Sequence, residues 1–415
     1  MKGWGKMGGS DLEFDVIVAG AGPGGCTLAY LLARSGVRVA LVERHKELDR
    51  EFRGYFFQPS VMKLFDQMGV LDGVLALPHR KIDAFHFIDH GKRLFSVRFD
   101  DLPRPYHFGV NLAQPLLLQF LIDKASAFDN FTFMNGTVVT DLIKGEKGVS
   151  GVQVRRGSER LELSTRVVVG ADGRYSTVRK LAGIEQEKEE HQFDFVWFDM
   201  PAIGGKKYPL QIQIEDEGML IHIPMGKDKV QIGWVIRKGT YNELRRQGIE
   251  QFRNRLSAVE PGLQSGLARH LVDFKQCSIL DIQVAMMKSW VQDGLLLIGD
   301  AAHIASPFSG QGNSLAIQDA VAAHPVIMEA LRTSTGILSK RELHLYEKER
   351  RPAVAQIQSI QRMQANMLGI RNPLLLRLRR TAVPIVSHTP LFERMRNKLA
   401  LGSKPIHVAT DYFVR

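Results

Sequence analysis

The chain of 415 residues is long enough for two or three domains or for one large composite domain, and its content of 44% hydrophobic and 24% charged residues is typical of a globular protein. Its formal charge of +11 would suit nucleic-acid binding, but almost all of the excess lies in residues 340–404, which hold 14 Lys or Arg against 4 acids. Because no nucleic-acid motif accompanies these residues, we interpret them as a mostly solvated helical face. Only two cysteines, Cys26 and Cys277, are present, and no apolar run approaches the roughly 20 residues that cross a bilayer, so we expect a cytoplasmic protein without a membrane span.

The first predicted elements are a strand, a glycine-rich turn, a helix and a second strand at residues 15–43. The apolar run 16–18 predicts a buried strand, and the leucines of 28–32 recur on one helix face before a stop at Gly36. The run 37–42 predicts the second strand, which ends in Glu43. The turn between the first strand and the helix contains Gly20, Gly22, Pro23, Gly24 and Gly25.

This order of elements is typical of a dinucleotide-binding site. Gly20 would make the tight turn, Gly22 would let the backbone approach a pyrophosphate, and Gly25 would let the helix pack on the strand. The free amides and the positive dipole end of the helix favour phosphate. Glu43, about 20 residues further on, is placed to accept hydrogen bonds from a ribose. The pattern alone does not distinguish FAD from NAD.

Several polar candidates follow in loops and at helix ends. Arg44 and Arg53 come next, and Arg53 could contact a phosphate or a flavin edge or, equally, be a surface arginine. Gln114 stands at the entrance of a helix predicted to run to about residue 128, where its amide could reach a ligand. The remaining predictions here are a helix at 61–69, a hairpin at 82–99 with its turn at 90–91, and strands at 131–139, 151–154 and 161–169.

The strand at 161–169 runs into a second glycine-flanked turn. Asp172 stands in this turn, and Ser176 is a candidate helix cap with Arg179 behind it. Residues 190–280 then change character, because short alternating runs predict an antiparallel sheet. The predicted strands are 193–200, 210–215, 219–224 and 230–236, and the predicted helices are 241–256 and 262–272.

A third apolar strand, at 294–298, runs into Gly299 and Asp300. Open α/β sheets bind ligands at the carboxyl ends of their strands, where Asp300 is expected. Pro307 follows, and Gly310 and Gly312 then open a helix at Asn313, whose free amides could stabilise negative charge on a reduced flavin.

Together, these three motifs resemble those of the flavin-dependent monooxygenases of the p-hydroxybenzoate hydroxylase class, the group A aromatic hydroxylases. The resemblance covers about residues 12–345 in the family's order and spacing. It implies that Glu43 holds the adenosine ribose, that Arg53 and Gln114 contact the flavin or its phosphates, and that Asp300 binds the ribityl-pyrophosphate region. It also implies that Asp172 serves both FAD and the nicotinamide coenzyme. The full set of expected cofactor contacts is Gly20, Gly22, Pro23, Gly24, Gly25, Glu43, Arg44, Arg53, Gln114, Val138, Asp172, Gly299, Asp300, Pro307, Gly310, Gly312 and Asn313, with no metal ligand.

The resemblance further implies an activity. NADPH or NADH would reduce the FAD, dioxygen would add to give a C4a-hydroperoxyflavin, and its distal oxygen would pass to a small, usually aromatic substrate. A flavin-dependent halogenase shares the fold, but of that family's Trp-x-Trp-x-Ile-Pro motif only Ile223 and Pro224 are present. A flavin reductase of the same fold or a non-catalytic FAD-binding protein would also carry these motifs. The substrate-activating residue is not identified, and His222, Gln211, Gln213 and Trp234 are candidates only as residues of strands expected to cover the flavin.

The implied fold is α/β, with a glutathione-reductase-like FAD-binding βαβ domain, an antiparallel-sheet substrate domain and a C-terminal helical segment. The predicted boundaries are 12–85, 109–187 and 278–345 for the first, 86–108 and 188–277 for the second, and 346–415 for the third. The basic and apolar third segment could contact membrane lipids, form a dimer contact or, as the preferred interpretation, cap the FAD domain. The expected partners are the substrate and O2, without nucleic acid, in a monomer or homodimer.

Overall fold

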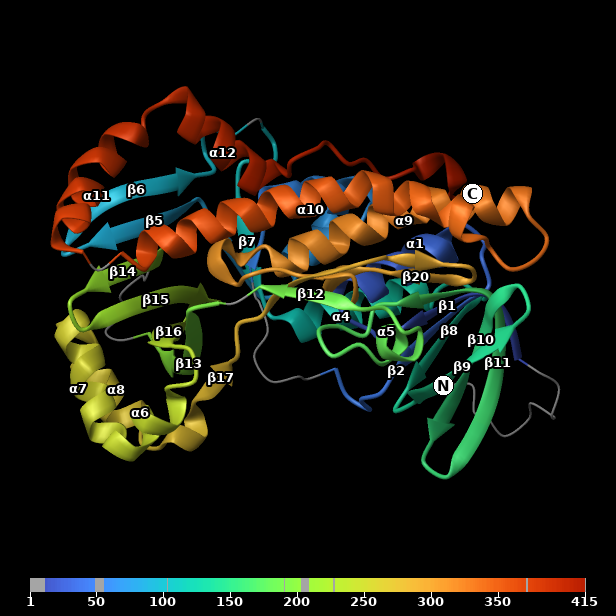
Figure 1. Cartoon of the computed structure of the whole chain (residues 1–415), viewed down its shortest axis with the longest axis horizontal. Coiled ribbons are helices and arrows are strands. Elements are labelled where there is room, and N and C mark those ends of the chain that lie inside the picture. Colours follow the sequence, from blue (N-terminus) through green and yellow to red (C-terminus); the bar gives the residue numbers. More distant parts are fainter. Residues whose placement is uncertain are drawn as a thin grey trace.

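The computed structural model describes residues 12–48, 56–102, 104–189, 191–202, 209–226, 228–370 and 372–414. Two large sheets form the two lobes of the molecule, and the long helix α10 (Lys340–Leu368) runs across both of them beside α9 (Gly312–Thr333) (Figure 1).

The first lobe is built on a sheet of eight strands whose centre is parallel. The order is β19-β20-β11-β1-β2-β8, and Val18 of β1 lies opposite Val169 of β11 and Leu41 of β2. These apolar runs are fully buried because helices cover them, as is usual for parallel sheets. The bounds are β1 (Leu12–Ala19), β2 (Val39–Glu43), β8 (Phe131–Asn135), β9 (Val138–Gly145), β10 (Gly148–Arg156), β11 (Glu159–Gly170), β19 (Val291–Gln292) and β20 (Leu295–Leu297).

Helices α1 (Pro23–Arg34), α4 (Gln114–Ala125) and α9 pack together on this lobe. The expected α/β fold with a βαβ unit at its N-terminal end is therefore confirmed. One strand expectation was too long, because Gly136, with a φ of +62°, separates β8 from β9 within the predicted strand 131–139.

The second lobe is built on a sheet of seven strands in the order β17-β13-β16-β15-β14-β5-β6. All neighbours are antiparallel except β14 and β5, which are parallel. The predicted hairpin turn at His90 and Gly91 is present, and both residues have positive φ. The bounds are β5 (Ala84–Asp89), β6 (Lys92–Arg98), β13 (Phe193–Pro201), β14 (Leu210–Glu215), β15 (Gly218–Met225), β16 (Lys229–Arg237) and β17 (Ser278–Leu280).

The outer face of the seven-stranded sheet packs against helices that follow it in the chain. The predicted helix 241–256 is broken at Gly248, whose φ of +89° separates α6 (Tyr241–Gln247) from α7 (Ile249–Val259). The predicted helix 262–272 is shorter, as α8 (Gln264–His270) preceded by a 3-10 turn. Trp234 and Phe252 meet in the apolar cluster between sheet and helices.

Smaller elements connect the two lobes. They are the sheet of β3 (Phe56–Phe57), β7 (Gly109–Leu112) and β4 (His79–Ile82), the sheet of β12 (Gln186–Glu189), β18 (Val284–Met287) and β21 (His303–Ile304), and the helices α2 (Pro59–Gln67), α3 (Leu71–Ala76) and α5 (Thr177–Leu181).

The C-terminal segment continues α10 with α11 (Pro373–Val386) and α12 (Pro390–Leu401). Two of its basic side chains, Arg350 and Arg379, are buried rather than solvated, and each pairs with a buried aspartate. Among the described helices, none combines the length and apolar composition needed to cross a bilayer. The division of the chain into domains stays a prediction.

Candidate active site

A pocket of about 310 Å³ lies between the carboxyl ends of the parallel strands and the inner face of the seven-stranded sheet. Arg53 lies outside the described residues, but every other expected cofactor contact lines this pocket. These residues are Gly20, Gly22, Pro23, Gly24, Gly25, Glu43, Arg44, Gln114, Val138, Asp172, Gly299, Asp300, Pro307, Gly310, Gly312 and Asn313. Segments separated by nearly 300 residues therefore converge on one space.

The glycines of the first turn differ in what they do. Gly20 has a φ of +107°, and a Cβ there would lie 2.5 Å from the carbonyl oxygen of Ala171. A Cβ on Gly25 would lie 2.0 Å from the carbonyl oxygen of Gly20, so both positions are required by backbone packing. A Cβ on Gly22 would meet nothing closer than 3.9 Å, because Gly22 faces the open pocket at the start of α1.

Helix α1 begins in a manner that suits an anionic ligand. Gly22 is its N-cap, and among the described residues no side chain caps its first turn. The amides of that turn and the positive dipole end are therefore directed at the pocket without an internal partner, as a pyrophosphate requires.

Glu43 links the end of β2 to the glycine turn. Its Oε2 accepts the amide hydrogen of Ala21 at 2.9 Å, and its Oε1 accepts that of His45 at 3.0 Å. The buried side chain thus holds the turn and also lines the pocket, which is the position of the ribose-binding acid in a dinucleotide fold.

Asp172 acts as a cap for α5. One carboxylate oxygen accepts from the Ser176 hydroxyl at 2.5 Å, and the other accepts from the amides of Thr177 and Val178. Burial raises the pKa of the Asp172 carboxyl, although these hydrogen bonds favour its charged form. The predicted Ser176 cap is confirmed, because its Oγ accepts the amide hydrogen of Arg179 at 2.9 Å.

Two arginines connect the turn that contains Asp172 to the turn that contains Asp300. The buried Arg179 donates to the carbonyl oxygens of Ala301 and Arg174. The Nε of Arg174 lies 3.9 Å from the Asp300 carboxylate, which is one-third exposed to the pocket. The turn that contains Asp172 thus supports the turn that carries Asp300.

Asp319 of α9 was not among the residues expected from the sequence. Its fully buried carboxylate accepts from the Gly299 amide at 2.9 Å, from His303 Nε2 at 2.6 Å and from Arg350 Nε at 2.8 Å. Burial would raise the pKa of Asp319, but His303 and Arg350 outweigh it and lower the pKa to about 2. An acid on an otherwise apolar helix face was the only available signal, and it did not reveal these partners.

The first turn of α9 forms the other wall of the cofactor half of the pocket. No described side chain caps this turn, since the N-cap Gln311 donates its amide to the carbonyl oxygen of Leu399 instead. Gln114 donates to Asn313 Oδ1 at 2.9 Å and so joins α4 to α9. A dinucleotide can therefore meet two uncapped helix starts, those of α1 and α9.

The far half of the pocket is apolar and aromatic, with one buried amide. Gln231 of β16 is 5% exposed and lies opposite Asp199 of β13. The surrounding side chains come from the inner face of the seven-stranded sheet and from the loop before α9: Phe85, Phe195, Trp197, Leu210, Ile212, Ile221, Ile223, Leu280 and Phe308.

The strand residues that the sequence offered as substrate contacts point the other way. Gln213 donates to the carbonyl oxygen of Val259 in α7, Trp234 packs on Phe252, and Gln211 lies 3.1 Å from a ring nitrogen of His222. Because side chains alternate between the faces of a strand, their neighbours line the pocket instead. The strands that carry the four candidates do border the pocket, but through these neighbouring residues.

In the described part of the chain, no group of three or more His, Cys, Asp or Glu side chains is arranged to hold a metal ion. The fold and the pocket define an FAD-binding α/β flavoprotein, in which glycine turns and two uncapped helix starts fit a dinucleotide with a pyrophosphate.

Comparison with known proteins agrees with this class. Residues 13–360 match the family model described as FAD binding domain. The chain is 37% identical over 400 residues to 6-methylpretetramide 4-monooxygenase of Streptomyces rimosus, a match that covers 96% of this chain and 95% of that protein. The chain therefore belongs to the FAD-binding-domain family, and it is an FAD-dependent monooxygenase of the class that its motifs resemble.

Two solved structures show how widely the fold is shared. The p-nitrophenol 4-monooxygenase of Pseudomonas putida DLL-E4 superposes with a TM-score of 0.80 at 16% identity and covers 95% of this chain and all of its own. A myxobacterial chondrochloren halogenase superposes with a TM-score of 0.74 at 20% identity and covers 93% of each chain. At these identities the likeness concerns the fold alone.

Proposed function

We propose that the protein uses NADPH or NADH and dioxygen to hydroxylate a planar, phenolic aromatic substrate. The observation that carries this proposal is a single pocket that joins the dinucleotide-binding turns to a wall of aromatic and aliphatic side chains. In the proposed reaction, one oxygen atom enters the substrate as a hydroxyl group and the other leaves as water, with two electrons from the nicotinamide coenzyme.

The residues of the cofactor half hold FAD in this proposal. The amides of the first turns of α1 and α9 receive the pyrophosphate and the flavin edge, and Glu43 receives a ribose hydroxyl. Asp300 contacts the ribityl-pyrophosphate region, and Asp172 positions the loop beside it. When bound, FAD supplies the redox chemistry that activates dioxygen.

The residues of the far half position the substrate and exclude water. Phe195, Trp197 and Phe308 offer ring faces and edges to a planar molecule. Gln231, the buried amide on this wall, orients the substrate through a hydroxyl or carbonyl group.

We also propose that the protein works in the cytoplasm. The two free cysteines of the described chain support this reducing location.

The cofactor assignment is tested with Asp300→Ala. This variant should purify with little or no yellow flavin, whereas Asp123→Ala, a control at an exposed position of α4, should keep its flavin. Full flavin content in Asp300→Ala would refute the role of Asp300.

The reaction is tested by coenzyme consumption in the presence of polycyclic phenols and labelled dioxygen. We expect faster NADPH or NADH oxidation and one labelled oxygen atom in the product. Halogenated product in the presence of chloride or bromide would favour a halogenase, saturated product would favour a flavin reductase, and no turnover with any donor would favour a non-catalytic FAD-binding protein.

A further inference from the structure

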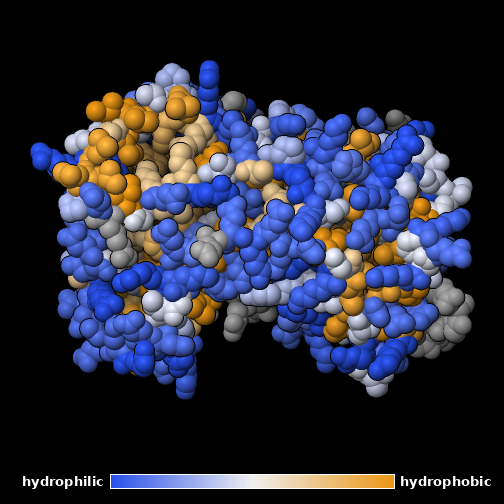
Figure 2. Space-filling model, in the orientation of Figure 1, coloured by the Kyte–Doolittle hydropathy of each residue, from blue (hydrophilic) through white to orange (hydrophobic). Residues whose placement is uncertain are grey.

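An apolar surface on α11 and α12 has no cover within the described residues. Seven of the 14 large hydrophobic side chains that are exposed in the structure lie between residues 374 and 401. Leu374, Ile385 and Leu391 are 78%, 73% and 73% exposed, and the others are Leu375, Leu378, Val386 and Leu401. Figure 2 shows these orange side chains gathered at the end of the molecule where Figure 1 places α11 and α12.

The exposed side chains of α11 form a stripe rather than a scatter. Leu374, Leu378 and Ile385 are separated by four and seven residues, which places them on one side of the helix. The opposite side is fixed to the protein, because the buried Arg379 donates from Nε and Nη2 to Asp89 Oδ2 at 3.1 and 2.5 Å. The helix therefore cannot turn its leucines inward without breaking a buried ion pair.

The border of this stripe is cationic. Arg377 and Arg394 are exposed on α11 and α12, and Lys92 and Arg93 are exposed on β6 next to the hairpin turn at His90 that Arg380 contacts. None of the four takes part in an ion pair within the described ranges. Four acids at this end of the molecule have partners of their own. Asp89 pairs with Arg379, Glu393 pairs with Arg396, and Glu215 and Asp216 lie within ion-pair distance of His90.

We propose that this apolar stripe with its cationic border docks the protein on an anionic lipid surface. Exposed leucines and isoleucine enter the boundary between headgroups and acyl chains, and the free cations attract anionic headgroups. A second copy of the chain fits less well, because a symmetric contact through this face would bring the same cations together. Protein and lipid charges are complementary, whereas protein and protein charges are not.

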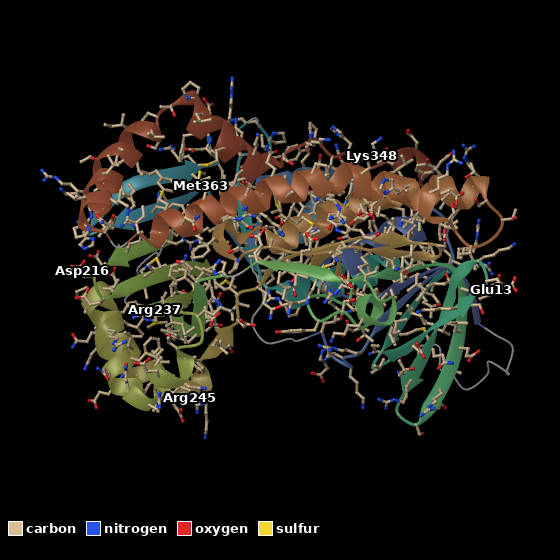
Figure 3. All side chains as sticks on the ribbon, in the orientation of Figure 1. Glu13, Asp216, Arg237, Arg245, Lys348 and Met363 are labelled. Atoms are coloured by element: carbon tan, nitrogen blue, oxygen red, sulfur yellow. The ribbon has the colours of Figure 1, made fainter. Side chains whose placement is uncertain are left out.

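The docked face lies on the substrate side of the molecule. Val383 and Met395 beneath the stripe belong to the same apolar cluster as Phe85 and Ile221, which line the pocket. Met363 of α10 is 52% exposed at the same end of the molecule (Figure 3). An apolar substrate dissolved in the lipid would thus be held near the half of the pocket that receives it.

The test is co-sedimentation of the full-length holoprotein with vesicles of phosphatidylcholine, with and without phosphatidylglycerol. We expect binding to the vesicles that contain phosphatidylglycerol, and weaker binding at high salt. The double variant Leu374→Asp/Leu378→Asp should bind at least about tenfold more weakly, since two apolar anchors are lost. The double variant Arg377→Glu/Arg394→Glu should also bind these vesicles about tenfold more weakly, because two cations at the border of the stripe are replaced by anions.

Leu116→Asp is the matched control, because Leu116 is an exposed leucine of α4, 38% exposed, away from the stripe. It should bind vesicles like the unaltered protein, and unchanged flavin content and melting temperature should show that all variants are folded. The proposal is overturned if the unaltered protein ignores vesicles with phosphatidylglycerol or if the leucine variant binds them equally well. It is also overturned if the unaltered protein is a dimer that only the leucine variant dissociates, because the face then belongs to a second copy. Vesicle binding is read without turnover, so this outcome is independent of the proposed reaction.

Discussion

Replacing Asp319 by asparagine should loosen the loop that carries Asp300. The substitution keeps the shape of the side chain but removes the charge that Arg350 and His303 face in a fully buried site. Arg350 is 2% exposed and cannot reach water without a change in packing. Because Asp319 also accepts the Gly299 amide hydrogen, the damage should pass directly to the cofactor loop.

The expected loss of stability follows from that burial. Leaving one member of a buried ion pair without its partner costs about 3–5 kcal/mol. For a chain of 415 residues the entropy of unfolding at the midpoint is about 0.9 kcal/mol per kelvin. The melting temperature of Asp319→Asn should therefore fall by about 3–6 °C. We expect the dissociation constant of FAD, measured by flavin fluorescence, to rise at least about tenfold.

The pH dependence gives an independent check. The pKa of Asp319 is about 2 in the folded protein and near 3.8 without its partners. Its charge therefore contributes stability that is present in full above pH 3.8 and is lost as the pH falls towards 2. The contribution is about 2.4 kcal/mol, so Asp319→Asn should show a smaller loss of stability than the unaltered protein over this range.

Glu329→Gln provides the control on the same helix, because the Glu329 carboxylate is exposed and pairs with Arg332 at the surface. It should melt within about 1 °C of the unaltered protein. The reasoning is refuted if Asp319→Asn also melts within about 1 °C, roughly the precision of the measurement, and binds FAD with unchanged affinity.

Two further predictions concern glycine geometry and a buried histidine. Gly25→Ala should lower both stability and flavin content, because its Cβ would lie 2.0 Å from the carbonyl oxygen of Gly20. Gly22→Ala should melt within about 1 °C of the unaltered protein yet bind FAD at least about tenfold more weakly, and equal FAD affinity would contradict a pyrophosphate at this turn. Burial lowers the pKa of His324 to about 4, so the stability supplied by its neutral ring is present above pH 6.5 and declines as the pH falls towards 4. Between about pH 6.5 and 5, the free energy of unfolding of the unaltered protein should fall by about 2 kcal/mol more than that of His324→Gln. An equal pH dependence of the two free energies would refute this.

The elements that could be predicted from the sequence are those encoded by neighbouring residues. An apolar strand followed at once by Gly20, by Gly170 or by Gly299 carries its own signal, since the strand and its glycine turn lie within a few residues. The Ser176 cap was found for the same reason, because its partner Arg179 is three residues away. The convergence of these turns on one pocket also followed, since parallel strands end at the same edge of a sheet.

The face that each strand of the second sheet turns to the pocket could not be read in this way. Apolar and polar residues alternate along β14, beginning with Leu210 and Gln211. The sequence does not say which of the two faces α7 will cover. Once α7 packs on the Gln211 face, Leu210 and Ile212 must line the pocket.

Local sequence thus determined the dinucleotide-binding turns and the class of enzyme, because those signals depend on backbone conformation over a short stretch. Tertiary structure alone decided the partners of Asp319, 20 residues from Gly299 and 31 from Arg350, and the outward direction of the α11 leucines, which depends on Asp89 nearly 300 residues earlier. Charges buried in pairs and helix faces left uncovered are properties of segments that meet only when the chain is folded.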